Sequence, residues 1–392
     1  MTQSLYLAFQ YLTFHKVRTL VLVASMSLIT FLPNGLKRLI TESEAQMMAR
    51  ADSTPLIVGA KGSSTDLVIN ALYFQQEATE NITMEMVDAL SATDLGYPIP
   101  FFSAFNARGF PIIGTTLEYF DFRRLRVGAG RSLGFLGECV IGADVADQLG
   151  ISVGDSLVSS PENFFDLAGV YPLKMTVVGV LEASNTPDDG AVFTDLRTTW
   201  VIMGLGHGHE NLEDVDDQSV LFGRDGNNIR ANAKLYLHNQ ITEANRNDIH
   251  FHGDRRNYPI SASLFVPKDK KAETILRGRF ETGQLPHQVV LPSHVVDNLL
   301  QSVFRVKQIF DIVFLVVGLA TLLILGLIGT LSVQIRKDEM HTLFTMGSSR
   351  SKIAEVLGFE LGMIVTVSVV AVGVLYILTG FFVEAFIQQY IL

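Results

Sequence analysis

The chain has 392 residues, of which 48% are hydrophobic, and its 30 Lys and Arg against 40 Asp and Glu give a net charge of −10. Residues 39–304 hold 20 of the basic and 34 of the acidic residues, so the middle is acidic while the two ends together are basic. An acidic middle argues against a nucleic-acid partner, and the length excludes a transporter with many spans. The single cysteine, Cys139, excludes an internal disulfide and is expected to be a buried small hydrophobic residue.

The first apolar run, Thr19–Leu36, is flanked by Lys16 and Arg18 before it and by Lys37 and Arg38 after it. A cleaved signal peptide is the competing interpretation, but no small-x-small cleavage site follows the run. We therefore predict an uncleaved first span with a cytoplasmic amino terminus. Its helix is expected to continue out of the membrane through LITESEAQMMARA.

The exported middle changes to short apolar runs separated by Gly and Asp, which predicts strands of about four to seven residues joined by turns and brief helices. The expected fold is an α+β core domain, with a more polar inserted lobe at about residues 204–257. The segment GAKGSS lacks the G-x-x-x-x-G-K-[ST] spacing of a phosphate loop, so we interpret it as a tight turn. Because the chain has no Walker A pattern, an ATPase would have to be a separate chain.

Two histidine pairs are the candidate metal ligands, His207 with His209 and His250 with His252. Side chains at i and i+2 share one face of a strand, so either pair could supply two imidazoles to Zn²⁺ or Cu²⁺. Polar surface loops that happen to contain histidine are the commoner case. No G-x-S-x-G motif suggests hydrolase chemistry, and an enzyme is not expected.

Two further apolar runs, Ile312–Ile335 and Leu361–Val383, each exceed the roughly 20 residues that cross a ~30 Å hydrocarbon core. The second span is expected to continue a helix that begins outside the membrane. The short loop between the two runs carries four Lys or Arg, which keeps it in the cytoplasm by the positive-inside rule. Within it, Ser348 or Ser349 can cap a helix that starts at Arg350.

These patterns together predict a multi-pass membrane protein with one amino-terminal span, two carboxyl-terminal spans and a large exported domain. The family resemblance described next implies that the membrane is the bacterial inner membrane and that the large domain is periplasmic. The predicted segments are a cytoplasmic segment (1–18), a first transmembrane helix (19–38), the periplasmic core domain (39–304, lobe 204–257), a second transmembrane helix (305–335), a cytoplasmic coupling loop (336–360), a third transmembrane helix (361–383) and a tail (384–392).

The sequence of the coupling loop, RKDEMHTLFTMGSSRSKIAEVLGFE, has an acidic residue, a leucine, a small-residue turn and a basic residue leading into the next span. With the core segments GTTLEYFDFRRLRVGAGRS and MTVVGVLEASNTPDDGAVFTDL, this loop resembles the MacB/FtsX/LolC-type permeases, the mechanotransmission class of ABC transporter. The family has four spans, and the fourth is not seen here. The residues that carry the resemblance, which implies ATPase coupling, are Glu339, Leu343, Met346, Gly347, Ser348, Arg350, Ile353 and Glu360.

The resemblance implies a permease subunit that forms a homodimer or pairs with a related permease and contacts membrane lipid. Two copies of a separate ABC ATPase would bind it, and the cofactors ATP and Mg²⁺ would belong to that partner, with none in this chain apart from possible Zn²⁺. A periplasmic or lipoprotein partner is also implied, and the cargo is open among lipoprotein, lipid, peptide and drug. The alternative function is an FtsX-like membrane-anchored regulator or sensor that activates a periplasmic partner.

Overall fold

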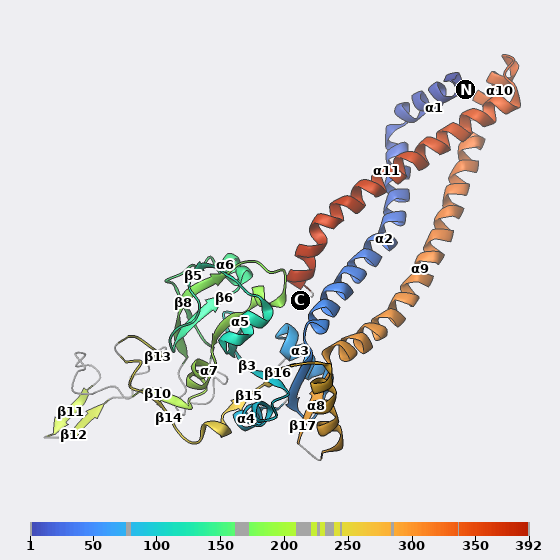
Figure 1. The fold of residues 1–392 in the computed structure, drawn as a ribbon. Coiled ribbons are helices and arrows are strands. Elements are labelled where there is room, and N and C mark those ends of the chain that lie inside the picture. The colour runs from blue at the N-terminus through green and yellow to red at the C-terminus, as the bar shows by residue number, and fades with distance from the viewer. Residues whose placement is uncertain are drawn as a thin grey trace. The chain divides into compact units, whose positions relative to one another are not determined.

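The computed structural model describes residues 2–75, 80–160, 172–208, 221–225, 228–231, 239–243, 245–283, 286–335 and 337–390. These residues form two compact units. The helical unit comprises residues 1–46 and 298–391, and the mixed unit comprises residues 47–297 (Figure 1). Each unit has its own interior and is described separately below.

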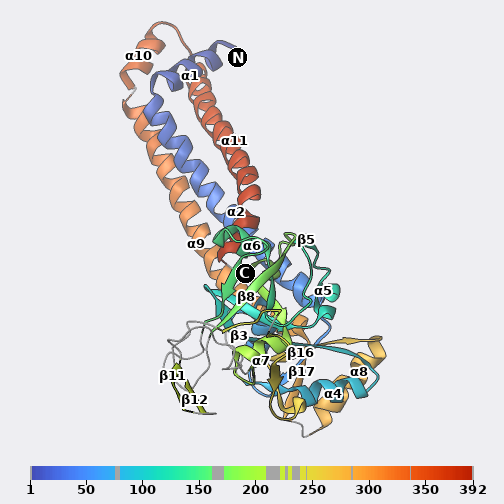
Figure 2. The same ribbon diagram turned by 90° about the vertical axis from the view of Figure 1, so that its left-hand side faces the viewer.

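The helical unit is built from long helices joined by short connections (Figure 2). Two helices are long and apolar enough to cross a membrane by length and composition, α2 and the Arg350–Gly380 part of α11. Helix α9 runs unbroken through the second predicted span, and its shorter apolar segment Asp311–Ala320 lies inside that span. The helices of this unit are α1 (Thr2–Phe14), α2 (Lys16–Asp52), α9 (Pro292–Ile335), α10 (Lys337–Thr345) and α11 (Arg350–Tyr390).

At the amino terminus, one predicted feature is present and one helix is unexpected. The expected continuation of the first helix beyond the apolar run is confirmed, because α2 extends to Asp52 with Pro33 inside it. Helix α1, however, was not predicted, since residues 1–18 were assigned only as a cytoplasmic segment. The second span, the third span and the count of spans stay predictions.

Helices α2 and α11 pack against each other through small and polar side chains. The Ser27 hydroxyl donates to the Ser368 carbonyl oxygen at 3.3 Å, and both serines are buried. Further along, the Arg38 guanidinium donates to the Tyr376 carbonyl oxygen at 2.8 Å and lies 4.6 Å above the Tyr376 ring. Because the contacts advance along both helices in the same direction, α2 and α11 run parallel. Hydrogen bonds between small residues are a usual way to join apolar helices.

The mixed unit is centred on an eleven-stranded sheet among the described residues, with strand order β13-β8-β6-β9-β4-β3-β16-β1-β17 and with β5 and β7 both paired to β8. The pairs β4–β9, β6–β8 and β8–β13 are parallel and the other pairs of this sheet are antiparallel. The unit is therefore a mixed α/β fold. The expected α+β fold is confirmed at this coarser level.

The strands of the large sheet are β1 (Leu56–Ala60), β3 (Gly96–Ala107), β4 (Phe110–Thr115), β5 (Val127–Gly130), β6 (Glu138–Ile141), β7 (Ser156–Val158), β8 (Leu173–Leu181), β9 (Val192–Asp195), β13 (Asn239–Gln240), β16 (Ala262–Pro267) and β17 (His287–Val290). Three small sheets use β2 (Ile82–Thr83), β10 (Gly206–Gly208), β11 (Leu221–Asp225), β12 (Asn228–Ala231), β14 (Ile249–Phe251) and β15 (Pro259–Ile260). The helices are α3 (Ser64–Tyr73), α4 (Met84–Ala92), α5 (Leu117–Arg123), α6 (Ala143–Leu149), α7 (Leu196–Ile202) and α8 (Lys270–Thr282), with 3₁₀ turns at Pro187–Gly190 and Arg255–Asn257.

The main core lies between the sheet and its helices, where strand residues such as Phe102, Ile112 and Val192 are fully buried. Cys139 is fully buried as expected, and burial raises the pKa of its thiol to about 12. The segment GAKGSS is a turn between β1 and α3, and the Ser63 hydroxyl accepts a hydrogen bond from the Asp66 amide to cap α3. Strand β13, within the predicted lobe at 204–257, pairs with β8 of the large sheet, and the lobe itself stays a prediction.

The last turn of α2 is held in the interior of the mixed unit by a buried ion pair. The Arg50 guanidinium donates to both carboxylate oxygens of Asp188, at 2.6 and 3.0 Å, and to the Leu72 carbonyl oxygen at 2.6 Å. The Tyr119 hydroxyl donates to the same carboxylate at 2.8 Å, and Thr186 adds a fourth donor. Burial by itself raises the pKa of Asp188, but Arg50 more than offsets this and holds that pKa below its usual value.

We predict that Asp188→Asn destabilises the protein by about 3–5 kcal/mol, because the substitution leaves the buried Arg50 cation without its counter-charge. The exposed Asp147→Asn on α6 is the matched control and should leave thermal unfolding, followed by circular dichroism, unchanged. The stabilisation that Asp188 supplies should be complete above its unfolded-state pKa of about 3.9. It should then be lost as the pH falls toward the lower folded-state pKa. An Asp188→Asn protein that unfolds at the wild-type temperature at neutral pH would contradict this role.

Candidate functional site

The candidate site centres on the tight turn between α10 and α11, residues 346–349, which we call the coupling turn. Helix α10 ends with the Met346 amide donating to the Thr342 carbonyl oxygen and the Gly347 amide donating to that of Phe344, each at 3.0 Å. Gly347 has φ of 98°, a left-handed conformation that side chains rarely adopt. The Ser349 hydroxyl then accepts from the Lys352 amide at 3.3 Å and caps the start of α11. The predicted helix start at Arg350 is confirmed, with Ser349 rather than Ser348 as the cap.

Apolar and basic side chains project from the coupling turn and its flanks. Met346 is 79% exposed and Phe344 is 47% exposed. The Arg350 guanidinium lies 5.8 Å from the Phe344 ring centre, and the Lys352 ammonium pairs with Glu355 at 2.9 Å. Exposed large apolar side chains beside cations are typical of a surface that another protein covers.

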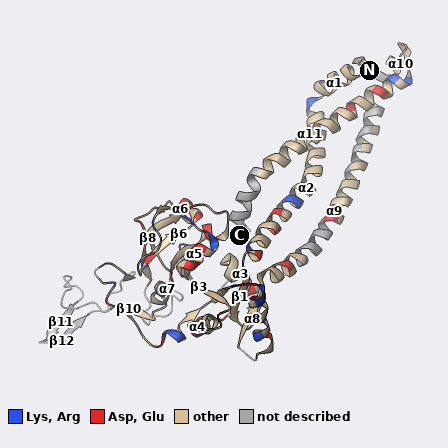
Figure 3. Ribbon diagram, in the orientation of Figure 1, with Lys and Arg blue, Asp and Glu red and all other residues tan. Residues whose placement is uncertain are grey.

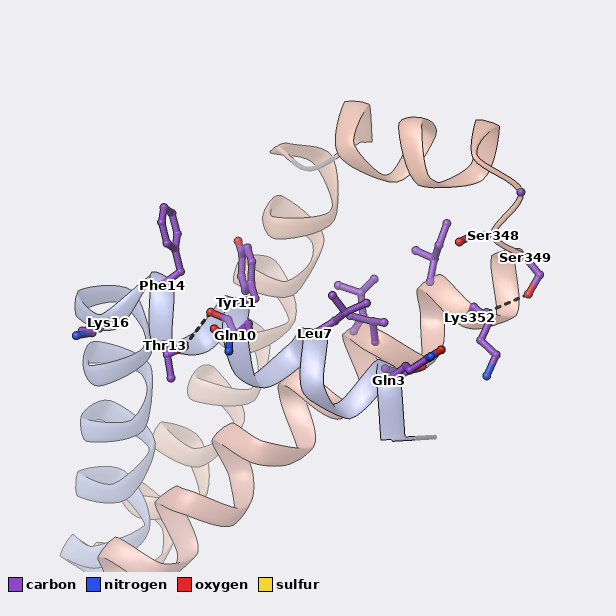
Figure 4. A pocket seen from close by; sticks show the side chains of 15 residues that line it. Gln3, Leu7, Gln10, Tyr11, Thr13, Phe14, Lys16, Ser348, Ser349 and Lys352 are labelled. Carbon is purple, nitrogen blue, oxygen red and sulfur yellow. Dashed lines mark hydrogen bonds between the residues drawn. The ribbon is translucent and has the colours of Figure 1, made fainter.

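Helix α1 lies along the start of α11, and together they form a groove of about 1090 Å³ (Figure 4). Leu7 points from α1 toward the side chains of α11, with Gln3 at the end near Lys352 and Phe14 at the opposite end (Figure 4). The α11 wall includes Ile353, which is half-buried. The groove therefore continues directly from the coupling turn onto the amino-terminal helix.

Helix α1 has no charged residue in its sequence, TQSLYLAFQYLTF, and appears without blue or red in Figure 3. One face is buried, with Ala8 fully covered and Ser4 6% exposed, while Tyr6 and Phe9 are more than half exposed. A 13-residue helix is about 20 Å long and so is too short to span a membrane.

Helix α1 belongs to the candidate site, although none of the sequence predictions includes it. The sequence feature that indicates α1 is the spacing of Ser4, Ala8 and Tyr11, which are small or amphipathic residues. They follow one another at intervals of four and three residues, as on one face of a helix, before the basic residues of the first span.

The structure places the predicted coupling residues as follows. Met346, Gly347 and Ser348 form the coupling turn, Arg350 and Ile353 lie in the first turn of α11, and Glu360 is buried within α11. The backbones of Glu339 and Leu343 lie on α10, and their side chains are outside the described part of the structure.

The model of the MacB-like periplasmic core domain family matches residues 20–233. The chain belongs to this family. The resemblance found in the sequence is thereby confirmed for the family, and the protein has a membrane anchor and a periplasmic domain of the ABC-transporter permease type.

Solved structures similar to this member of the MacB-like family include the following three domains. The extracellular domain of the noncanonic ABC-type transporter YknZ from Gram-positive bacteria is 12% identical with a TM-score of 0.33, covering 60% of this chain and 98% of that one. The periplasmic region of MacB from Actinobacillus actinomycetemcomitans is 10% identical with a TM-score of 0.36, covering 64% and 97%. A domain of a putative permease protein from Porphyromonas gingivalis is 12% identical with a TM-score of 0.27, covering 60% and 86%. The search of curated proteins gives no significant match.

One histidine of each pair lies on the ribbon of β10 and β14 in this MacB-like chain, His207 on β10 and His250 on β14. The register places His207 opposite His250, and the rings of His250 and His252 are 4.7 Å apart. His209 and the side chain of His207 lie outside the described residues. Among the described side chains, no group of three or more His, Cys, Asp or Glu is placed to hold a metal ion. Metal binding stays a prediction.

If the ribbon binds a metal, the full-length protein in detergent should take up Zn²⁺ saturably, and His207→Gln or His250→Gln should weaken uptake at least tenfold. Removal of one imidazole takes away a ligand of a site that needs three or four. His294→Gln, an exposed histidine on α9, is the matched control. Isothermal titration measures the binding, and equal binding by all four proteins would exclude these histidines as ligands.

Proposed function

We propose that the chain is the permease subunit of an ABC transporter that couples ATP hydrolysis by a separate ATPase to movement of its periplasmic domain. Two copies would form a dimer in the bacterial inner membrane, each bound by one copy of the ATPase. The observation that carries this proposal is that the coupling turn and its flanks present apolar and basic side chains between two long apolar helices, α9 and α11. Family membership in the MacB-like group supports the same function.

The chemistry of the site defines the surface that the ATPase would present. Met346 and Phe344 require an apolar recess, because burying exposed apolar area is the main source of affinity in such contacts. Arg350 favours carboxylates at the edge of that recess. The groove between α1 and α11 enlarges the docking surface beyond the coupling turn.

Contacts within each unit offer a route for movement away from the turn. Helix α11 begins at the coupling turn and is joined to α2 through Ser27 and Arg38. The final turn of α2 is joined to the periplasmic core by the Arg50–Asp188 ion pair. A displacement of α11 would therefore reach the core through hydrogen-bonded contacts and the α2 backbone rather than through loops.

On this proposal the protein transmits force, and the ATP and Mg²⁺ belong to the partner. The cargo is a molecule that the periplasmic domains move or release. Both export and extraction of a substrate are compatible with this coupling of ATP hydrolysis to domain movement.

We predict that Glu339→Lys or Arg350→Glu reduces co-purification of the ATPase roughly tenfold, about 1.4 kcal/mol, because each reverses a charge of the predicted coupling segment. The measurements are the amount of ATPase that co-purifies with the tagged full-length chain and the ATP turnover of the complex. Lys270→Glu on α8 of the periplasmic domain is the control charge reversal and should change neither. Wild-type ATPase binding and turnover by both loop variants would refute the docking role.

The groove can be tested with two leucines of α1 that have similar exposure. Leu7, 53% exposed, lines the groove, whereas Leu5, 45% exposed, does not. We predict that Leu7→Ala weakens ATPase association by about 1–2 kcal/mol, the value of a truncated apolar contact, while Leu5→Ala has little effect. Association is measured by titrating purified ATPase onto the protein in nanodiscs. Equal effects of the two substitutions would contradict a docking role for the groove.

A further inference from the structure

A second cavity, of about 610 Å³, lies entirely within the periplasmic unit and has no role in the proposed coupling. Its apolar walls come from α4 and α7, where Met84, Val87, Leu196 and Trp200 are each less than 10% exposed. The buried residues expose only small areas to the cavity, so it suits one or two inserted side chains. A volume of this size is typical of sites for small molecules or short peptide segments.

The polar rim of this cavity is rich in hydrogen-bond acceptors. Lys268 donates its amide to the Leu95 carbonyl oxygen at 2.8 Å, so the odd-numbered residues at the start of β3 face β16. The Pro98 carbonyl therefore points away from β16, toward the side of β3 that pairs with β4. Strand β4 ends at Thr115 and does not extend as far as Pro98. Proline has no amide hydrogen. This part of the edge of β3 therefore offers a hydrogen-bond acceptor, but it lacks the N–H donor with which an added strand would normally pair.

Two carboxylates, Glu118 and Asp195, extend the acceptor surface along the rim. The hydrogen bond with Thr116 holds the pKa of Glu118 below its usual value, so the group is charged at neutral pH. Burial raises the pKa of Asp195, which accepts a hydrogen bond from the Arg197 amide. Within the part of the chain that the structure describes, neither carboxylate forms a side-chain ion pair. A partly buried carboxylate without such a partner gains from an approaching cation.

The two arginines at the rim are already engaged with other groups. The Arg197 guanidinium lies 5.2 Å from the centre of the Phe251 ring, and Arg255 faces Asp88 with an N–O distance of 3.8 Å. A ligand that uses the acceptors Glu118, Asp195 and the Pro98 carbonyl must bring donors and positive charge.

We propose that this cavity binds a short, extended segment of a partner polypeptide, with an apolar side chain inserted against Trp200 and a neighbouring lysine or arginine held by Glu118 and Asp195. The Pro98 carbonyl would accept a hydrogen bond from the segment. The acidic balance of the periplasmic domain, net −14 over residues 39–304, favours the approach of a basic partner. This assignment does not depend on the coupling turn or on ATPase docking.

Trp200 provides a direct readout because it is the single tryptophan of the chain and lines the cavity. The probe is an acetylated and amidated tetrapeptide of alternating lysine and leucine, titrated onto the full-length protein in nanodiscs of neutral lipid. Saturable change in Trp200 emission is expected. The double variant Glu118→Gln, Asp195→Asn should bind the probe at least tenfold more weakly, since both charges that hold its lysines are gone.

The controls separate recognition from general effects. Asparagine also caps helices well, so Asp195→Asn retains the start of α7, and an unchanged melting temperature verifies the fold. Asp147→Asn removes an acid remote from the cavity and should bind like wild type. An equal response to a glutamate–leucine tetrapeptide, undiminished binding by the double variant, or the lack of a saturable signal would each overturn the proposal.

Discussion

The buried ion pair between Arg50 and Asp188 is the interaction on which the organisation of the periplasmic unit depends. The guanidinium at the end of this long helix is buried, and a buried charge without partners would be costly. The carboxylate of Asp188, the Leu72 carbonyl and the Tyr119 hydroxyl together satisfy it. Burial raises the pKa of Tyr119 to about 12, so this hydroxyl stays protonated and can donate. These directional hydrogen bonds fix the position of the end of α2. Apolar packing alone would leave the helix end free to shift.

Directional hydrogen bonds also fix the packing of helices within the helical unit. Apolar helices in lipid gain little from further apolar burial, so Ser27, Ser368 and Arg38 supply the specificity that joins α2 to α11. At the start of α11, Ser349 and Gly347 end one helix and begin the next within four residues. This tight turn keeps Met346 exposed, and that exposure is the physical basis for assigning a partner there.

Local patterns allowed several features to be predicted. The helix start at Arg350 follows from a serine pair before a helical run, and the extension of α2 follows from the lack of a breaker between Leu39 and Asp52. The strand lengths were less well predicted, because β3 has 12 residues and β8 has nine, and a strand's length depends on its neighbours in the sheet.

By itself, the sequence determined the local elements: the apolar helices, the basic loop between two of them, the cap at the start of α11 and a family resemblance. These depend on residues close together in the chain. The tertiary structure alone decided which distant residues meet, such as Arg50 with Asp188, Leu7 with the α11 wall, and Pro98 with Asp195 across one cavity. Such contacts depend on the order of strands in the sheet and on how the helices pack. Both are set by interactions among all elements of the fold, so the spacing of residues within one segment does not determine them.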